Sequence, residues 1–351
     1  EAALEYSITG LDAEPEISCT LGGIECAADG HGAAVFFLLP DAALLNCTFT
    51  APSGSQITLN GVPLTDLYRT GQDIAYPAAG VESASAGIPM ESVYTVPRFH
   101  SLPIVAGTFE GVPLTFIQSG TDFRAEYPPS LLYSCHITVP AGSEVTMRGV
   151  SCTPYRTGTT EAYPGLFDGD AAMPLLDVYE LSELYLPCAD VNAVYKGEAL
   201  SVSASEEGKC THYAALYPSA DIPAAEERAL AFVRDYFTYV SSGYRNTGEN
   251  LQAALTHVLS GSNLSSVLLR SKGSISFLTP VSSQEDRSLS VRETRRIGED
   301  TVVCVIDFAI NQKIYYIQKQ FSGSMSLVCT EKNGIWYASR MLLDAQQEDV
   351  K

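Results

Sequence analysis

Hydrophobic and polar residues alternate in short runs along the first two thirds of the chain. In HITVPAGSEVTMRGV (136–150) the apolar Ile137 and Val139 stand two positions apart, and the same spacing returns after the Pro-Ala-Gly-Ser segment. A period of two places side chains on one face of a strand, and Pro-Ala-Gly-Ser is typical of a turn. TFTAPSGSQITLNGV (48–62) has the same pattern. Both segments are therefore predicted to be β-hairpins.

The similarity between these hairpins extends into a longer internal repeat. Residues 47–65 align with 135–153 without a gap, at an offset of 88 positions. YRTGQDIAYP (68–77) and YRTGTTEAYP (155–164) follow at an offset of 87. Further on, FEGVPL and YKGEAL match at an offset of 86. A copied ligand motif would not carry so much flanking sequence, so we predict a duplicated folding unit, each copy a small, mostly antiparallel sandwich.

The duplicated decapeptide has two interpretations. Two copies of Tyr-Arg-Thr-Gly would present arginine and tyrosine side chains to a ligand that carries carboxylates. Alternatively, Arg69 and Arg156 pair inside their own repeats, and Gly71 and Gly158 supply turns with positive φ. Both copies keep the decapeptide, although one ligand site would need only one. The structural interpretation is therefore favoured.

After residue 220 the period changes from two to that of a helix. Asp221 is a suitable N-cap, Pro223 suits the first turn, and apolar residues then recur on one face up to about residue 244, with Tyr236 widening the apolar stripe. Two further helices are predicted, ENLQAALTHVLS (249–260) and one that starts at 262 or 263. Long strands follow, and KNG at 332–334 is predicted to be the last hairpin turn.

These patterns predict a multidomain chain: two tandem, mostly β, sandwich-like repeats followed by an α+β domain. We place the repeats at 1–113 and 114–217 and the last domain at 222–346. Helices followed by a meander of long antiparallel strands that ends in NGIWYAS resemble the NTF2-like fold, in which a curled sheet wraps around helices to form a cone.

The whole arrangement, two repeats with the hairpin P-[SA]-G-S-x-[IV]-T-[LM]-x-G before such a domain, is similar to the extracellular parts of membrane-anchored Firmicutes proteins. The teicoplanin-resistance-associated family is the example it resembles. That resemblance implies a cell-envelope location, a sensing or wall-binding role and a transmembrane anchor upstream of residue 1. It brings no catalytic motif.

The net charge of the chain limits the kinds of molecule that it is expected to bind. The chain has 41 acidic and 21 basic residues, a net charge of −20, and such a field repels phosphate backbones and anionic lipid surfaces. Nucleic acid is therefore not expected as a partner. The longest apolar stretch, at 33–45, is interrupted by Pro40 and Asp41 and is too short to span a bilayer. We therefore expect contact with a membrane only through the upstream anchor.

The nine cysteines are compatible with both disulfide bonds and free thiols. Their spacings contain no Cys-x-x-Cys pair, so neither zinc nor another metal is expected. An odd number leaves at least one thiol without a partner in the chain, and buried free cysteines are an equally good interpretation. We expect few or no disulfides.

A search for catalytic chemistry gives only weak candidates. In the C-terminal domain the groups available to an NTF2-like isomerase or dehydratase are Asp235, Tyr236, Tyr239, His257, Asp307 and Tyr316. Asp307 shares its strand face with Val303 and Val305, away from the more apolar face that should contact the helices. Asp168 and Asp170 lack the further ligands of a calcium loop. No catalytic residue, cofactor or metal is therefore predicted.

The predicted binding residues are Tyr236, Tyr239 and Trp336, which combine apolar area with a polar tip. Trp336 is expected either to close the core or to form the floor of an open cleft. Neutral or cationic peptide or glycan fragments, such as those of peptidoglycan, suit the acidic chain as ligands. The predicted function is thus a non-enzymatic, extracellular cell-envelope binding or sensor module. The alternatives are an NTF2-like enzyme with accessory repeats and a purely structural spacer.

Overall fold

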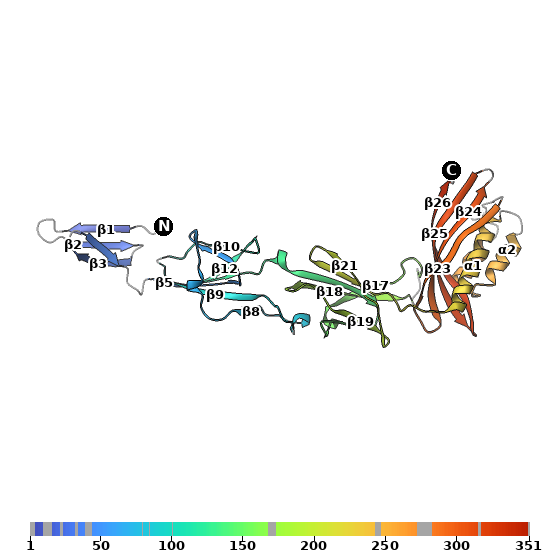
Figure 1. The fold of residues 1–351 in the computed structure, drawn as a ribbon, viewed down its shortest axis with the longest axis horizontal. Helices are drawn as coiled ribbons and strands as arrows, with labels where there is room; N and C mark the ends of the chain where they lie inside the picture. The colour runs from blue at the N-terminus through green and yellow to red at the C-terminus, as the bar shows by residue number, and fades with distance from the viewer. Residues whose placement is uncertain are drawn as a thin grey trace. The chain divides into compact units, whose positions relative to one another are not determined.

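The structure is a computed structural model, and its chain divides into two compact units. Unit 1 contains residues 1–134 and 182–188, and unit 2 contains residues 135–181 and 189–351. Figure 1 shows the elements in chain order. The described residues are 4–9, 16–21, 24–31, 34–38, 44–78, 80–83, 85–99, 101–167, 173–242, 247–271, 283–314 and 317–349.

The first sheet lies before the duplicated sequence. It is an antiparallel meander in which the strands follow in the order β1-β2-β3-β4. These strands are β1 (Leu4–Thr9), β2 (Glu16–Leu21), β3 (Ile24–His31) and β4 (Ala34–Leu38).

The first repeat consists of two sheets. One has the strand order β12-β13-β5-β9-β8 and the other β11-β10-β6-β7. Their strands are β5 (Leu45–Pro52), β6 (Gln56–Leu59), β7 (Val62–Pro63), β8 (Ile74–Ala75), β9 (Met90–Phe99), β10 (Val105–Phe109), β11 (Val112–Pro113), β12 (Phe116–Ser119) and β13 (Asp122–Ala125). Short 3₁₀ helices η2 (Asp66–Tyr68) and η3 (Gly80–Glu82) lie between the strands. The repeat thus continues past residue 113, because β13 pairs with β5.

The second repeat has the same strand order in both sheets. Its sheets are β21-β22-β14-β18-β17 and β20-β19-β15-β16, which match the first repeat strand for strand. The 3₁₀ helix η4 (Pro129–Leu131) precedes them. The elements are β14 (Tyr133–Pro140), β15 (Glu144–Met147), β16 (Val150–Ser151), η5 (Thr153–Tyr155), β17 (Arg156–Glu161), β18 (Leu175–Leu184), β19 (Val191–Tyr195), β20 (Glu198–Ala199), β21 (Ser203–Glu207) and β22 (Cys210–Ala214).

Alternation along the strands builds the core of each repeat. Cys47 and Phe49 of β5 are fully buried and pack with Ile57 of β6 from the other sheet. In the second repeat Cys135, Ile137 and Val139 are equally buried, as the sequence pattern predicts. Cys47 and Cys135 therefore occupy equivalent core positions as small apolar side chains.

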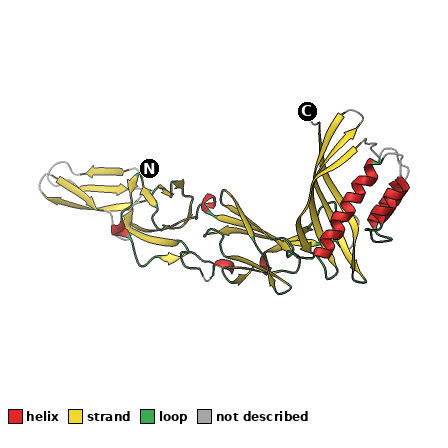
Figure 2. Cartoon of the chain, turned by 45° about the vertical axis from the view of Figure 1, so that its right-hand side comes forward, coloured by secondary structure: helices red, strands yellow, loops and turns green. Residues whose placement is uncertain are grey.

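The C-terminal region, residues 223–349, contains three helices and a four-stranded antiparallel sheet in the order β23-β24-β25-β26. Figure 2 shows the helices against the strands. The elements are α1 (Pro223–Ser241), α2 (Thr247–Leu255), α3 (Asn263–Ser271), β23 (Ser283–Arg296), β24 (Thr301–Ile314), β25 (Ile317–Lys332) and β26 (Ile335–Asp349). Asn333 and Gly334 both have positive φ, which gives the predicted tight turn between β25 and β26.

The N-terminus of α1 differs from its prediction. Ile222, not Asp221, is the N-cap residue, and its side chain makes no capping hydrogen bond. Pro223 begins the helix as expected, because its fixed φ suits the first turn and its missing N–H has no helical partner there.

One face of the C-terminal sheet packs against the helices, and part of the other face packs against the second repeat. Cys304, Ile306 and Phe308 of β24 face the helices and belong to the main core. Val303 and Val305 face the other way and pack with Leu166 and Phe167 of the second repeat. The second repeat and the C-terminal region therefore share a core within unit 2. The β-rich, multidomain architecture is confirmed, and the three domain boundaries stay a prediction.

Candidate functional site

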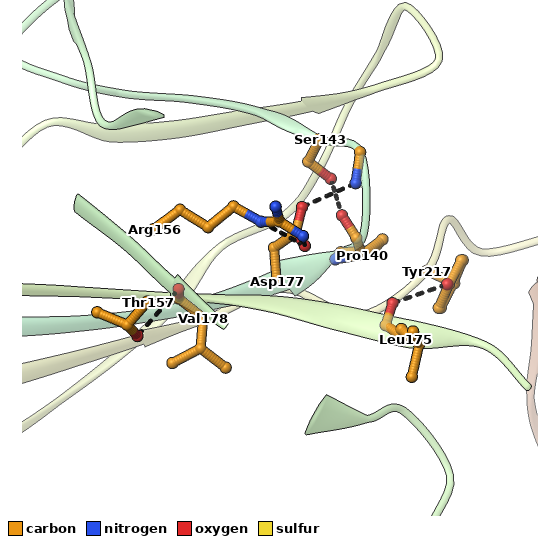
Figure 3. Close-up of polar contacts among 9 residues, drawn as sticks. Pro140, Ser143, Arg156, Thr157, Leu175, Asp177, Val178 and Tyr217 are labelled. Atoms are coloured by element: carbon orange, nitrogen blue, oxygen red, sulfur yellow. Dashed lines mark hydrogen bonds and ion pairs between the residues drawn. The ribbon is translucent and has the colours of Figure 1, made fainter. Parts of the chain in front are cut away.

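The duplicated arginine of the second repeat, Arg156, forms an ion pair inside its own repeat. Arg156 donates from Nε and Nη2 to Oδ1 of Asp177, at 2.8 and 2.6 Å. The other carboxylate oxygen of Asp177 accepts the backbone N–H of Gly142 at 2.8 Å (Figure 3). The Asp177 side chain is 5% exposed, so this carboxylate joins the decapeptide to the Pro-Ala-Gly-Ser turn inside the sandwich.

The first repeat makes the same link with a different carboxylate. Arg69 pairs with Asp73, which accepts hydrogen bonds from Ser53 of the hairpin turn and from Ser92. Ser92 stands in β9 where Asp177 stands in β18, so the carboxylate has moved from the strand to the loop. The hydrogen bonds from Arg69 and then Ser53 hold the pKa of Asp73 below its usual value. Both arginines are thus paired internally, as the structural interpretation predicts.

The two glycines of the decapeptide differ from each other. Gly71 has φ of 78° and forms the predicted turn. Gly158 lies within β17, where it pairs with Val178 of β18, and it does not adopt positive φ. The prediction for Gly158 was wrong because Thr159 and Thr160 follow it, and β-branched residues favour a strand.

Two of the three predicted binding residues lie inside the C-terminal core. Tyr239 is fully buried, and its hydroxyl lies 3.0 Å from the Ser271 hydroxyl of α3. Tyr236 is 5% exposed and stacks on Phe232. Burial, and to a smaller degree Tyr239, raises the pKa of Tyr236 to about 12. Both tyrosines therefore belong to the core of the C-terminal region.

Trp336 combines both of its predicted roles. It is 7% exposed and belongs to the main core beneath the helices. It also lines an open pocket of about 450 Å³ on the surface of the C-terminal region. The other lining residues come from α1, from the turn after α2 and from the last hairpin: Ala224, Glu227, Arg228, Ala231, His257, Gly334 and Ile335.

A hydrogen-bonded chain positions the polar side of this pocket. Nε2 of His257 lies 3.0 Å from Oδ2 of Asp235, and Nδ1 lies 3.0 Å from Nη1 of Arg228. Because the guanidinium can only donate, Nδ1 accepts, and the ring proton on Nε2 is donated to Asp235. The Arg228 guanidinium also lies over the Tyr337 ring, 5.8 Å from its centre. Arg228 is therefore held at the pocket wall by two contacts.

Helix geometry explains why these groups meet. Arg228 and Asp235 are seven residues apart on α1, which is two turns, so both face the same side. The backbone carbonyl of His257 accepts the N–H of Ala338 in the last strand, and the N–H of Leu259 donates to the Ala338 carbonyl, which fixes the backbone that carries the His257 ring. The sequence analysis missed Arg228 and Glu227. Their spacing from Asp235 on one helix face was the available signal, but it does not identify His257 as the partner.

Comparisons with protein-family models, with curated proteins and with solved structures found no match to the chain. The site must therefore be interpreted from its own geometry. Within the described ranges no helix is both long enough and apolar enough to cross a membrane.

The pocket is lined by one histidine and by the carboxylate of Glu227. An Asp–His pair can orient and assist a general base, but it needs a nearby nucleophile or acid to act upon. Tyr236 and Tyr239 face the core, and Asp307 pairs with Arg292 on the sheet face away from the helices. Tyr316, Asp168 and Asp170 lie outside the described residues. Among the described residues, Asp235 and His257 are thus the candidate catalytic groups that meet at this pocket.

The interior of the C-terminal region is filled by apolar side chains. Phe232, Leu268, Ile306 and Leu327 from helices and strands are fully buried there. Phe237 and Phe308 contact each other across the helix–sheet interface at 4.8 Å between ring centres. The described part of this interior is thus packed, whereas the pocket beside Trp336 is open at the surface.

Proposed function

We propose that the chain is a non-enzymatic, extracytoplasmic binding or sensor module of the cell envelope, with its ligand site in the pocket beside Trp336. The observation that carries this proposal is the contrast between a filled interior and an open pocket with a fixed arginine. The repeats act as a stalk with internally paired arginines, and the C-terminal region carries the binding site.

The pocket chemistry favours a peptide-containing ligand. Arg228 can receive a carboxylate, the exposed Glu227 can receive an ammonium group, and the Trp336 ring offers apolar surface. A net charge of −20 disfavours polyanions such as teichoic acid. Peptidoglycan fragments, which combine short peptides with neutral sugars, fit both conditions.

The fold assignment and the family likeness belong to the same proposal. We assign the C-terminal region to the NTF2-like class because three helices precede four long antiparallel strands and cover one face of their sheet. The duplicated hairpins before it support the likeness to the teicoplanin-resistance-associated family. Location at the cell surface follows from that likeness and from the ligand class.

The proposal is tested by titrating soluble muropeptides into the full chain while following the fluorescence of Trp336. This residue is the chain's single tryptophan, so its emission reports directly on the pocket. We expect a saturable change in emission. Arg228→Ala should weaken binding by about tenfold or more, because it removes the charged donor for the carboxylate.

Arg234→Ala is the matched control. Arg234 lies on the same helix and is exposed, but it does not line the pocket. An unchanged emission at millimolar ligand, or an equal loss of affinity in the Arg228 and Arg234 variants, would contradict the proposal. Tyr236→Ala is unsuitable for this test, because removing a core aromatic side chain would destabilise the whole region.

One observation favours the second candidate, an isomerase or dehydratase of the NTF2-like class: the contact between His257 and Asp235. An enzyme would chemically change the muropeptide, and Asp235→Asn would abolish that change. The binding module leaves the ligand intact. Mass spectrometry of the ligand after long incubation separates the two candidates.

A further inference from the structure

Four potential metal ligands gather on the outward face of the five-stranded sheet in the second repeat. The rings of His136 (β14) and His212 (β22) stack at 5.1 Å between centres, with 10° between their planes. Nδ1 of His136 lies 4.0 Å from a carboxylate oxygen of Glu180 in β18. Nε2 of His212 lies 3.5 Å from Sγ of Cys210. This group lies apart from the Trp336 pocket and has no role in the proposed binding function.

Strand alternation explains the grouping. His136 stands between the buried Cys135 and Ile137, so it faces outward. Cys210 and His212 flank the buried Thr211 and share one face of β22. Because β22 lies between β14 and β21, these outward side chains come from neighbouring strands.

A fifth candidate stands beside them. Glu207 of β21 is directly opposite Cys210 in the sheet register. Glu207 thus adds a second carboxylate to the same surface. It comes from β21 on one side of the two histidine strands, and Glu180 comes from β18 on the other side.

The donor types fit a borderline divalent metal. Imidazole nitrogens, a thiolate and a carboxylate are the ligands that Zn²⁺ takes in tetrahedral sites. Zn–S and Zn–N bonds in such a site place the sulfur and nitrogen about 3.6 Å apart. The separation between Cys210 and His212 is 3.5 Å, so this pair is already spaced as two ligands of one ion.

We propose that Cys210, His212 and His136 bind one Zn²⁺ ion on this face, with Glu180 or Glu207 as the fourth ligand. No three His, Cys, Asp or Glu side chains of the described residues are grouped closely enough to hold an ion as they stand. Binding therefore requires the exposed His136 ring to leave its stack and turn towards Cys210. The Cys210 thiol loses its proton to solvent as the Zn–S bond forms.

The first repeat provides an internal comparison. The equivalent positions there form a row across three strands, in which Asp122 stands in place of His212, Thr48 in place of His136 and Thr95 in place of Glu180. The first repeat builds the same sheets without these ligands, so the fold does not require them. The His and Cys residues of the second repeat are thus available to bind a metal. The sequence pattern did not indicate this, because it contains no Cys-x-x-Cys pair.

The test uses the full chain without a histidine tag and Co²⁺ as a spectroscopic substitute for Zn²⁺. We expect one ion per chain and a thiolate-to-cobalt charge-transfer band that Zn²⁺ displaces. Calorimetric titration of Zn²⁺ in buffers of different ionisation enthalpy should show proton release. Cys210→Ser should abolish the charge-transfer band, and His212→Ala should weaken Zn²⁺ binding at least about tenfold, since even outer-shell partners of metal ligands are worth that much.

Cys188→Ser is the control, because the Cys188 thiol donates to the backbone carbonyl of Ser134 and is not among the proposed ligands, and this variant should bind Zn²⁺ as the unmodified chain does. Circular dichroism of each variant checks that the sheets are intact. The proposal is overturned if no charge-transfer band forms, or if Cys210→Ser and His212→Ala leave stoichiometry and affinity unchanged. Muropeptide binding at Trp336 is measured separately, and its outcome does not bear on the Zn²⁺ site.

Discussion

Arg69 and Arg156 stand at equivalent positions of the two repeats. Each forms an ion pair with a carboxylate of its own repeat, but that carboxylate stands at a different position in each. Arg156 reaches a carboxylate on the neighbouring strand, and Arg69 reaches one four residues further along its own loop. In both repeats the carboxylate also binds the hairpin turn, through a backbone N–H in one and a serine hydroxyl in the other. The decapeptide is thus kept because it secures the turn.

This link predicts an acid sensitivity in the first repeat. The pKa of Asp73 is lowered by Arg69 and Ser53, so its ionised form stabilises the folded repeat above the ordinary aspartate pKa of about 3.9. That stabilisation is lost as the pH falls through the lower pKa of the folded state. Hydrogen-exchange mass spectrometry of β5 and β9 should show protection falling in acid, and Asp73→Asn should reduce this dependence.

Ser92→Ala is the control for Asp73→Asn. It removes the weaker hydrogen bond and keeps Arg69, so most of the pH dependence should remain. A profile for Asp73→Asn that coincides with that of the unmodified chain would contradict this assignment.

The glycines of the decapeptide give a second prediction. Gly71→Ala should cost about 1 kcal/mol, because an alanine side chain opposes φ of 78°. Gly158→Ala should be neutral or slightly stabilising, since the residue lies in a strand and an added Cβ would meet no atom within 4 Å. Hydrogen exchange of the surrounding strands measures both changes. Equal losses for the two variants would mean that Gly158 also forms a turn.

Among strands and helices, the sequence was most informative where local pattern and packing agree. The paired hairpins, the apolar stripe of α1 and the Asn-Gly turn depend on nearby residues, and all three are present. The stripe already included Tyr236 beside Phe237, which indicated a core position. The pocket depends instead on His257 meeting Arg228 and Asp235, and no sequence spacing determines that contact. The four-stranded sheet before the first repeat also went unrecognised.

The duplicated elements form an aromatic cluster in each unit. In unit 1 Tyr127 contacts Phe109, Tyr76 and Tyr185. In unit 2 the equivalents of Phe109 and Tyr127, Tyr195 and Tyr217, contact each other in the same edge-on way. Tyr163, the equivalent of Tyr76, packs on the core shared with the C-terminal sheet. The second tyrosine of each decapeptide, just before its final proline, thus packs against residues beyond its own sandwich.

Tyr163 allows this packing role to be measured. Its hydroxyl is buried and has no hydrogen-bond partner among the described residues, and burial raises its pKa well above 10. Tyr163→Phe should therefore leave the stability of unit 2 unchanged or raise it by up to about 1 kcal/mol, while Tyr163→Ala should cost about 2 kcal/mol or more. Urea denaturation followed by Trp336 emission measures the free energy of unfolding.

Tyr217→Phe is the matched comparison. The Tyr217 hydroxyl donates to the carbonyl of Leu175 at 3.0 Å, so its removal should cost about 1 kcal/mol (Figure 3). If Tyr163→Phe cost as much as Tyr217→Phe, the Tyr163 hydroxyl would have to make a bond of its own.

Across the described part of the chain, the ion pairs of the duplicated arginines lie apart from the open pocket beside Trp336. Arg69 and Arg156 are bound to carboxylates of their own sandwiches, whereas Arg228 is held by His257 at the wall of a pocket that Trp336 also lines. This division of roles underlies the proposal of a stalk with a binding region at one end of the sequence.

Sedimentation with purified peptidoglycan sacculi tests that proposal most directly. The full chain, Arg228→Ala and Arg234→Ala are each mixed with sacculi, and the protein in the pellet is measured over a range of concentrations. We predict saturable binding of the unmodified chain and of Arg234→Ala, and at least about tenfold weaker binding of Arg228→Ala. Failure of the unmodified chain to sediment, or equal sedimentation of all three proteins, would contradict it.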